Sequence, residues 1–326
     1  MFIEVLRPVR NSSHRFFATC LALGLTAASP AFAVEGAASV YILGSRTVNG
    51  GIVPPPGSYF NQGLYAYSGS AGVSIARPGQ VDIGLDATAR IGLSTYMWVP
   101  AWEPILGGRP YFSGTLVYGY KSIDLTATLT APGGAQISGA RSLSDVLIGD
   151  PVLGGGLGWG SGPLFGSLNF LVNVPIGSYE VGRPTNVAFN RWATDVTGAV
   201  TWLDQASGWQ ANLAAGVTFN GTNEDTDYSS GDEFHVEAAV AKSFASGWTV
   251  ALHGYHYDQI SADSGGQAVL GDFEGKVSAV GLGLSWAGEM SGRPVSLDAR
   301  YFHEFDAVNR PEGDGLLINL TIPLGG

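Results

Sequence analysis

Alternation of apolar and polar residues is the dominant pattern in this chain, and it is clearest between Val81 and Val99. Every odd position of that stretch except Thr95 is apolar. A period of two residues predicts a β-strand with one apolar and one polar face. Since about 9–11 tilted residues cross a bilayer, the stretch is long enough for a transmembrane strand. Its polar even positions are Asp82, Asp86, Thr88, Arg90 and Ser94.

The same alternation returns in residues 209–220 and 316–324. Strands of soluble sandwiches are usually only about 5–6 residues long. Outer-membrane barrels instead need long strands with an apolar exterior and a polar lumen. The pattern therefore predicts an all-β fold, a transmembrane antiparallel β-barrel. In this interpretation the apolar odd face of residues 81–99 contacts lipid, and its charged side chains point into the lumen.

Connections of two lengths alternate along the chain and indicate the topology. In barrels of this kind, short turns lie at the periplasmic rim and long loops lie outside. The alternation predicts twelve strands, and an even number returns both termini to the periplasmic side. The expected strands are 64–75, 81–99, 110–129, 143–159, 164–176, 189–203, 209–220, 233–244, 248–259, 273–287, 295–305 and 315–324. The link from Trp98 to Arg109 is the long periplasmic connection of this scheme, and it could contain a partial turn or a helix.

Tryptophan supports the same topology. Five of the eight tryptophans lie within a few residues of an expected short turn. Indole prefers the headgroup level of a membrane, with the ring in lipid and the N–H in water. We therefore expect an aromatic girdle at the periplasmic rim, although the same residues could be core anchors of a soluble β protein. The five are Trp159, Trp202, Trp209, Trp248 and Trp286.

The amino terminus has the features of a cleavable signal peptide over residues 1–33. Three arginines precede or flank an apolar core at residues 16–25, and Ala31-Phe32-Ala33 provides small residues for cleavage. The core is too short for a spanning helix, which needs about 20 residues. We expect export to the outer membrane, with residues 34–62 as a periplasmic or plug segment and residues 63–326 as the barrel.

Composition excludes several classes of function. Cleavage would remove Cys20, the one cysteine of the chain, so no thiol chemistry or zinc-thiolate site is expected. It would also leave 13 basic against 26 acidic residues. Because nucleic-acid binding depends on lysine and arginine, we expect no nucleic-acid partner. We also expect no metal and no cofactor.

The segment before the first expected strand contains three consecutive prolines, Pro54 to Pro56. Proline lacks the amide donor of a strand ladder and favours polyproline II. The segment is therefore either a flexible periplasmic leader or an ordered plug inside the lumen. In the second case Tyr59 and Phe60 would contact an apolar solute.

Ionisable residues on the expected lumen faces form the other candidate site. They could be a structural network that fills a narrow lumen, because charges inside a barrel must pair or stay hydrated. They could instead line a polar path that opens when the plug moves. The candidates are Asp86, Arg90, His235, Glu237, Arg300 and Glu304, with Asp82 and Asp298 on the same faces.

An enzyme is not expected. Barrel lipases and lipid A modifiers use serine and histidine at the outer face, but the chain has no Gly-x-Ser-x-Gly elbow and no acyl-transfer arrangement of serine and histidine. His253 and His256 are three residues apart on one strand, so they face opposite sides.

Short glycine-rich motifs in a consistent order resemble the outer-membrane proteins of the phenol meta-pathway degradation type. They include Pro54-Pro55-Pro56-Gly57-Ser58-Tyr59-Phe60, Val174-Pro175-Ile176-Gly177-Ser178-Tyr179, Asn220-Gly221-Thr222-Asn223 and Asn309-Arg310-Pro311-Glu312-Gly313. The resemblance covers nearly all of the chain after residue 33. It implies a barrel with a transport role and names no catalytic residue.

These observations predict an outer-membrane channel that takes up small hydrophobic or aromatic compounds and is surrounded by outer-membrane lipids. The alternatives are a structural or surface-interaction barrel without transport, and a lipid-modifying barrel enzyme. The oligomeric state stays open.

Overall fold

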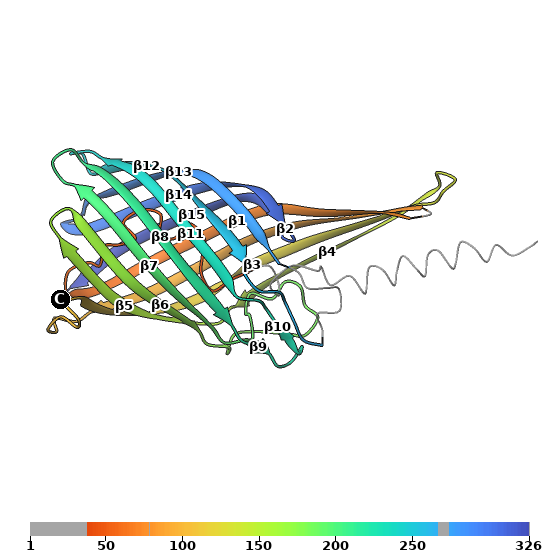
Figure 1. Cartoon of the computed structure of the whole chain (residues 1–326), viewed down its shortest axis with the longest axis horizontal. Coiled ribbons are helices and arrows are strands. Elements are labelled where there is room, and N and C mark those ends of the chain that lie inside the picture. Colours follow the sequence, from red (N-terminus) through yellow and green to blue (C-terminus); the bar gives the residue numbers. More distant parts are fainter. Residues whose placement is uncertain (1–37, 78, 267–273, 326) are drawn as a thin grey trace, which may run out of the picture.

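The computed structural model describes residues 38–77, 79–266 and 274–325, which form an all-β fold (Figure 1). The expected signal peptide at residues 1–33 lies outside the described residues. The strands are β1 (Gly57–Arg77), β2 (Gly79–Val99), β3 (Arg109–Thr130), β4 (Gln136–Ile148), β5 (Val152–Ser161), β6 (Leu164–Asn173), β7 (Ala193–Asp204), β8 (Trp209–Asn220), β9 (Thr222–Asn223), β10 (Tyr228–Ser229), β11 (Glu233–Ser243), β12 (Trp248–Gln259), β13 (Lys276–Met290), β14 (Arg293–Val308) and β15 (Glu312–Gly325).

Twelve strand positions close into an antiparallel barrel. The order runs from β2 through β1, β15, β14, β13, β12, β11, β8, β7, β6 and β5 to β3, and the pairing of β2 with β3 closes the ring. One position is divided: β5 pairs with Arg109–Thr115 of β3, and β4 pairs with Tyr118–Thr130 of the same strand. The prediction of a twelve-stranded transmembrane barrel is confirmed.

Several strand boundaries differ from the sequence prediction, among them the starts of β1, β4 and β7. β1 begins at Gly57, directly after the prolines, so Tyr59 and Phe60 belong to the barrel wall and not to the preceding segment. The expected strand 143–159 is interrupted at residues 149–151, where Pro151 supplies no amide donor for the ladder. The expected strand start at Phe273 lies outside the described residues, and β13 is described from Lys276.

The strands are amphipathic because successive side chains point to opposite faces. In β8, Gln210, Asn212 and Ala214 are buried in the interior, whereas Leu213 and Phe219 are exposed on the outside. Large exposed apolar side chains recur on β11, β12 and β13. The outer surface is therefore an apolar belt of the kind that contacts lipid.

The two ends of the barrel differ in their connections. Four short turns lie at one end, and each contains a glycine with positive φ: Gly162, Gly208, Gly247 and Gly292. The connection from β2 to β3 also lies at this end, whereas residues 174–192, 221–232 and 260–275 connect strands at the other end, where β1 to β4 project well beyond the remaining strands (Figure 1). By the general rule for bacterial barrels, the short-turn end faces the periplasm. Trp202, Trp209 and Trp248 are exposed on the outer surface near that end, as the girdle prediction requires.

The described residues include no helix that is long and apolar enough to cross a membrane.

Candidate functional site

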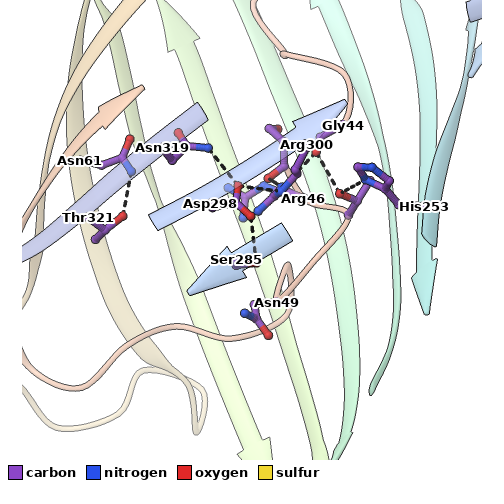
Figure 2. A network of polar contacts seen from close by, with 12 residues as sticks. Gly44, Arg46, Asn49, Asn61, His253, Ser285, Asp298, Arg300, Asn319 and Thr321 are labelled. Atoms are coloured by element: carbon purple, nitrogen blue, oxygen red, sulfur yellow. Dashed lines mark hydrogen bonds and ion pairs between the residues drawn. The ribbon is translucent and has the colours of Figure 1, made fainter. Parts of the chain in front are cut away.

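Residues 38–56, which precede β1 and are here called the internal segment, lie inside the barrel. Two side chains of opposite charge hold this segment there. Glu237 of β11 accepts hydrogen bonds from the backbone amides of Gly44 (2.5 Å) and Arg46 (2.9 Å). Arg300 of β14 donates to the carbonyl oxygens of Gly44 (3.0 Å) and Ser45 (2.6 Å). Both side chains are buried, and Figure 2 shows the contacts of Arg300. A carboxylate thus binds amides while a guanidinium binds carbonyl oxygens of the same turn.

The charge of Arg300 is balanced on its own strand. Asp298 lies 2.9 Å from the Arg300 Nε atom. Ser285 and Asn319 donate to the Asp298 carboxylate at 3.2 and 3.3 Å (Figure 2). Because a buried charge is costly without partners, this network offsets the cost of burying the Arg300 guanidinium and holds it directed at the segment.

Further contacts attach the segment to the polar wall formed by β6, β7, β8, β11 and β12. The Asn49 amide donates to the Asn212 side chain (3.0 Å), and the Gly51 amide donates to the Thr201 hydroxyl (3.1 Å). The Ser167 hydroxyl donates to the Gly50 carbonyl (2.8 Å). Two further contacts involve histidines: the Thr47 hydroxyl lies 3.0 Å from the His253 Nδ1 atom, and the Tyr41 ring stacks on the His235 ring with 3.6 Å between centroids.

Four of the predicted site residues point inward, as the alternation indicates. His235, Glu237, Arg300 and Glu304 are all buried on the lumen side. Three of them contact the segment directly or through a stacked ring. His235 also lies 2.9 Å from the Asp195 carboxylate. Their part in a solute path stays a prediction.

The expected orientation of Asp86 and Arg90 is wrong. Both side chains are exposed, while Ala87, Ala89 and Ile91 on the alternate face of β2 line the internal cavity. The apolar face of β2 therefore faces the lumen and its polar face is external. Tyr59 lines the same cavity, whereas Phe60 lies on the opposite face of β1 by the strand alternation.

An apolar cavity of about 670 Å³ lies inside the barrel, between the internal segment and the wall formed by β1, β2 and β3. On the barrel side its apolar side chains come mainly from the odd positions of β2, which face inward, whereas the inward positions of β3 add Val117 and also the polar Ser113, Thr115 and Lys121. It also receives ring faces from Tyr59 and Tyr111. Its apolar wall comprises Ala87, Ala89, Ile91, Leu93, Met97, Val117, Val152 and Leu171.

The outer end of this cavity carries hydrogen-bonding groups. The Glu304 carboxylate accepts hydrogen bonds from the hydroxyls of Tyr67 (2.7 Å) and Tyr255 (2.8 Å). The Arg310 guanidinium lies over the ring of Tyr257, 4.5 Å from its centroid. The sequence analysis missed these tyrosines, although Tyr65 and Tyr67, like Tyr255 and Tyr257, are two residues apart and must share a face.

The barrel wall is interrupted beside the cavity, where β4 ends and β5 begins. Among the strands described in the structure, β4 pairs only with β3. Residues 174–192 cover this interruption, and Asp150 anchors them. Its carboxylate accepts hydrogen bonds from the amides of Gly177 (2.8 Å), Phe189 (2.7 Å) and Asn190 (3.1 Å).

Replacement of Asp150 by alanine is expected to release this covering loop, because three backbone amides lose one shared acceptor. Val187, which is buried at the interruption, provides the reporter. A Val187→Cys protein should resist an impermeant thiol reagent on intact cells, and the same cysteine combined with Asp150→Ala should react several-fold faster. Val181→Cys, which is exposed in the same loop, should react equally in both backgrounds. Unchanged protection of the cysteine at 187 would contradict the anchoring role of Asp150.

Within the described residues, no group of three or more histidine, cysteine, aspartate or glutamate side chains is placed to hold a metal ion.

A closed ring of twelve antiparallel positions, an apolar outer belt and a lumen occupied by the amino-terminal segment define an outer-membrane β-barrel. The chain belongs to the family described as "Putative MetA-pathway of phenol degradation", which matches residues 66–320. The resemblance stated from the sequence motifs is thereby confirmed.

Several solved structures are similar to this chain at low sequence identity, and the first of them shares its fold. The COG4313 outer membrane channel from Pseudomonas putida F1 superposes with a TM-score of 0.61 and 13% identity, over 86% of this chain and 99% of that chain. The CymD monoaromatic hydrocarbon channel gives a TM-score of 0.40 and 6% identity, over 84% and 90% of the two chains. The transport unit of the autotransporter AIDA-I from Escherichia coli gives 0.43 and 9%, over 94% and 96%. Among curated proteins, no sequence matches this chain.

Proposed function

We propose that the protein conducts small hydrophobic, aromatic solutes across the outer membrane. The observation that carries the proposal is the apolar wall of the internal cavity. A water-filled pore for hydrophilic solutes has a polar lumen, but here Ile91, Leu93 and Met97 of β2 face inward. The volume of about 670 Å³ lies within the range of small-molecule sites, roughly 300–1,000 Å³.

The distribution of polar groups fits an aromatic solute. The internal segment covers the polar wall of β6 to β12 and leaves the wall of β1 to β3, which is apolar mainly on β2, open to the cavity. Tyrosine rings add flat apolar surfaces on which an aromatic ring can pack. The family description, which refers to phenol degradation, agrees with this class of solute.

The interruption between β4 and β5 gives such a solute a way in from the membrane. A hydrophobic molecule concentrates in lipid, and among the described strands the edge of β4 that faces away from β3 has no partner, although the Gly149 amide still bonds the Val117 carbonyl oxygen of β3 (2.8 Å). Loop 174–192 lies over the interruption, and its Val187 and Phe189 line the cavity. Movement of this loop would connect the lipid to the cavity without opening a path for water. We infer no enzymatic step, since passage through the cavity requires no covalent change.

Filling the cavity tests this function. Ala89→Trp places an indole among the apolar lining residues and is expected to reduce uptake of radiolabelled naphthalene several-fold in cells that lack their own copy of the gene. Ala238→Trp is the matched control, because Ala238 is exposed on the outer face of β11. Heat-modifiability on gels checks that both variants fold. Equal uptake by the two variants, or no difference between cells with and without the protein, would reject transport and leave a structural or surface-interaction barrel.

A further inference from the structure

Residues Val53 to Pro56, here called the proline strip, separate the internal cavity from a second cavity at the short-turn end. Val53 lines both cavities, Pro54 lines the internal one and Pro56 lines the second. The second cavity, here called the rim pocket, has a volume of about 590 Å³. It is lined by the connection between β2 and β3, by the turn between β5 and β6, and by the strip itself, with Trp102, Trp159 and Phe165 as its aromatic side chains.

The proline strip is held by few contacts. Its three prolines have no amide hydrogen, so they can form backbone hydrogen bonds to the barrel only through their carbonyl oxygens. Arg109 donates to the carbonyl oxygens of Pro54 (3.1 Å) and Val53 (3.4 Å). Tyr59 donates its hydroxyl to the carbonyl oxygen of Pro55 (2.8 Å). Two side chains thus account for three carbonyl contacts of the strip.

The strip closes against the wall by a tight approach at Gly158. A β-carbon on Gly158 would lie 2.3 Å from the Val53 Cγ2 atom, so only glycine permits this contact. The preceding residues stay attached independently, through the amide of Gly51 on Thr201 and the Ser167 bond to Gly50. The strip can therefore move while the rest of the internal segment remains in place.

The connection between β2 and β3 that lines the rim pocket has a defined conformation. It contains a tight turn, in which Ile105 and Gly108 exchange hydrogen bonds of 2.9 and 2.8 Å. Leu106 holds a positive φ of 50° in this turn, a conformation that costs energy for a leucine. The Trp159 indole donates to the Leu106 carbonyl oxygen (3.1 Å), which ties the turn to β5.

Aromatic packing fixes the other side of the pocket. Trp102 packs edge-on against Trp98, with ring centroids 5.4 Å apart, and against Phe112 at 5.8 Å. Trp102 nevertheless keeps about half of its surface exposed. Trp102, Trp159 and Phe165 all line the pocket, and the exposed part of the Trp102 indole offers a surface on which a flat apolar molecule can pack.

We propose that the rim pocket is a second binding site for the aromatic solute, occupied as it leaves the barrel, and that the proline strip is the gate between the two sites. This inference rests on the proposed transport function and adds the exit. A solute in the internal cavity displaces Val53 from Gly158, passes the strip and reaches the rim pocket. The bonds from Arg109 and Tyr59 set how readily the strip moves.

Two variants test the exit. Ala101→Phe fills the rim pocket, which Ala101 lines, and Ala206→Phe is the matched control in another short-turn connection, between β7 and β8. Ala101→Phe is expected to reduce cellular uptake of radiolabelled naphthalene several-fold. The purified Ala101→Phe protein should still bind naphthalene in equilibrium dialysis, because the internal cavity is intact. Ala206→Phe should match the parent protein in both measurements.

A third variant tests the gate. Arg109→Ala combined with Tyr59→Phe removes all three carbonyl contacts and keeps the Tyr59 ring in the cavity wall, so uptake should be several-fold faster than in the parent. Heat-modifiability confirms folding of each variant. The rim site would be overturned if Ala101→Phe left naphthalene uptake unchanged. It would also be overturned if Ala101→Phe abolished both uptake and binding in equilibrium dialysis. Unchanged or slower uptake by the double variant would overturn the gate. Absence of uptake by the parent protein would instead reject the proposed function itself.

Discussion

Removal of residues 38–52 is expected to convert the protein into an open pore with a several-fold larger single-channel conductance in planar bilayers. All twelve strand positions and the proline strip remain in this variant, so the barrel should still fold and show heat-modifiability. The groups that hold the segment, including Glu237, His253 and Arg300, would then face an empty lumen. Because these groups are polar, water and ions would fill the space, and cells carrying the variant should become sensitive to bulky antibiotics.

A substitution provides the control for this deletion. Arg300→Gln shortens the side chain that holds the carbonyl oxygens of Gly44 and Ser45, but the segment stays attached through Glu237 and the polar wall. The Arg300→Gln variant should therefore have a low conductance, with brief openings to the conductance of the variant that lacks residues 38–52. If the deletion and the parent protein conduct equally, the segment does not block the lumen, and the barrier must lie elsewhere.

The sequence was sufficient to predict strand orientation wherever the two faces of a strand differ in polarity and the polar face meets the internal segment. β8 is an example: Asn212 is buried in the interior and Leu213 is exposed, as expected. The same holds for Glu237 and Arg300. These side chains point inward because the segment supplies amides and carbonyl oxygens that satisfy them.

β2 was predicted with its faces exchanged, and the reason is physical. Alternation defines two faces but does not determine which one contacts lipid, since a strand turned by one residue shows the same period. The rule that the apolar face is external fails when the lumen itself is apolar. Tyr96 and Trp98, on the same face as Asp86 and Arg90, were the available signal, because aromatic side chains at this rim belong to the external girdle.

The candidate site was only partly predictable, because its contacts join residues far apart in the chain. The sequence indicated a possible plug from its three prolines, yet it placed Tyr59 and Phe60 on that segment and not on β1. Arg109 and Asp150 gave no periodic signal, since each acts on the backbone of a distant loop. The missing amide of Pro151 was an available signal for the interruption between β4 and β5, but the expected strand 143–159 ran through it.

Leu213→Arg is expected to destabilise the barrel strongly, whereas Leu93→Arg should be tolerated. Leu213 is exposed on the lipid face of β8, four residues after Trp209. Leu93 lines the internal cavity, five residues before Trp98 on β2, so the two positions lie at similar depth. A cation on the lipid face near the bilayer midplane costs about 2–4 kcal/mol.

The arginine at position 93 would instead project into the cavity, where water can enter around the charge and reduce its desolvation cost. Urea unfolding in lipid vesicles, followed by the gel shift on heating, should therefore separate the two variants by most of that difference. Leu93→Arg should still abolish naphthalene uptake, because it places a charge in the apolar cavity. If Leu93→Arg were instead the less stable variant, the odd face of β2 would contact lipid. The cavity would then lack the apolar wall on which the transport function depends.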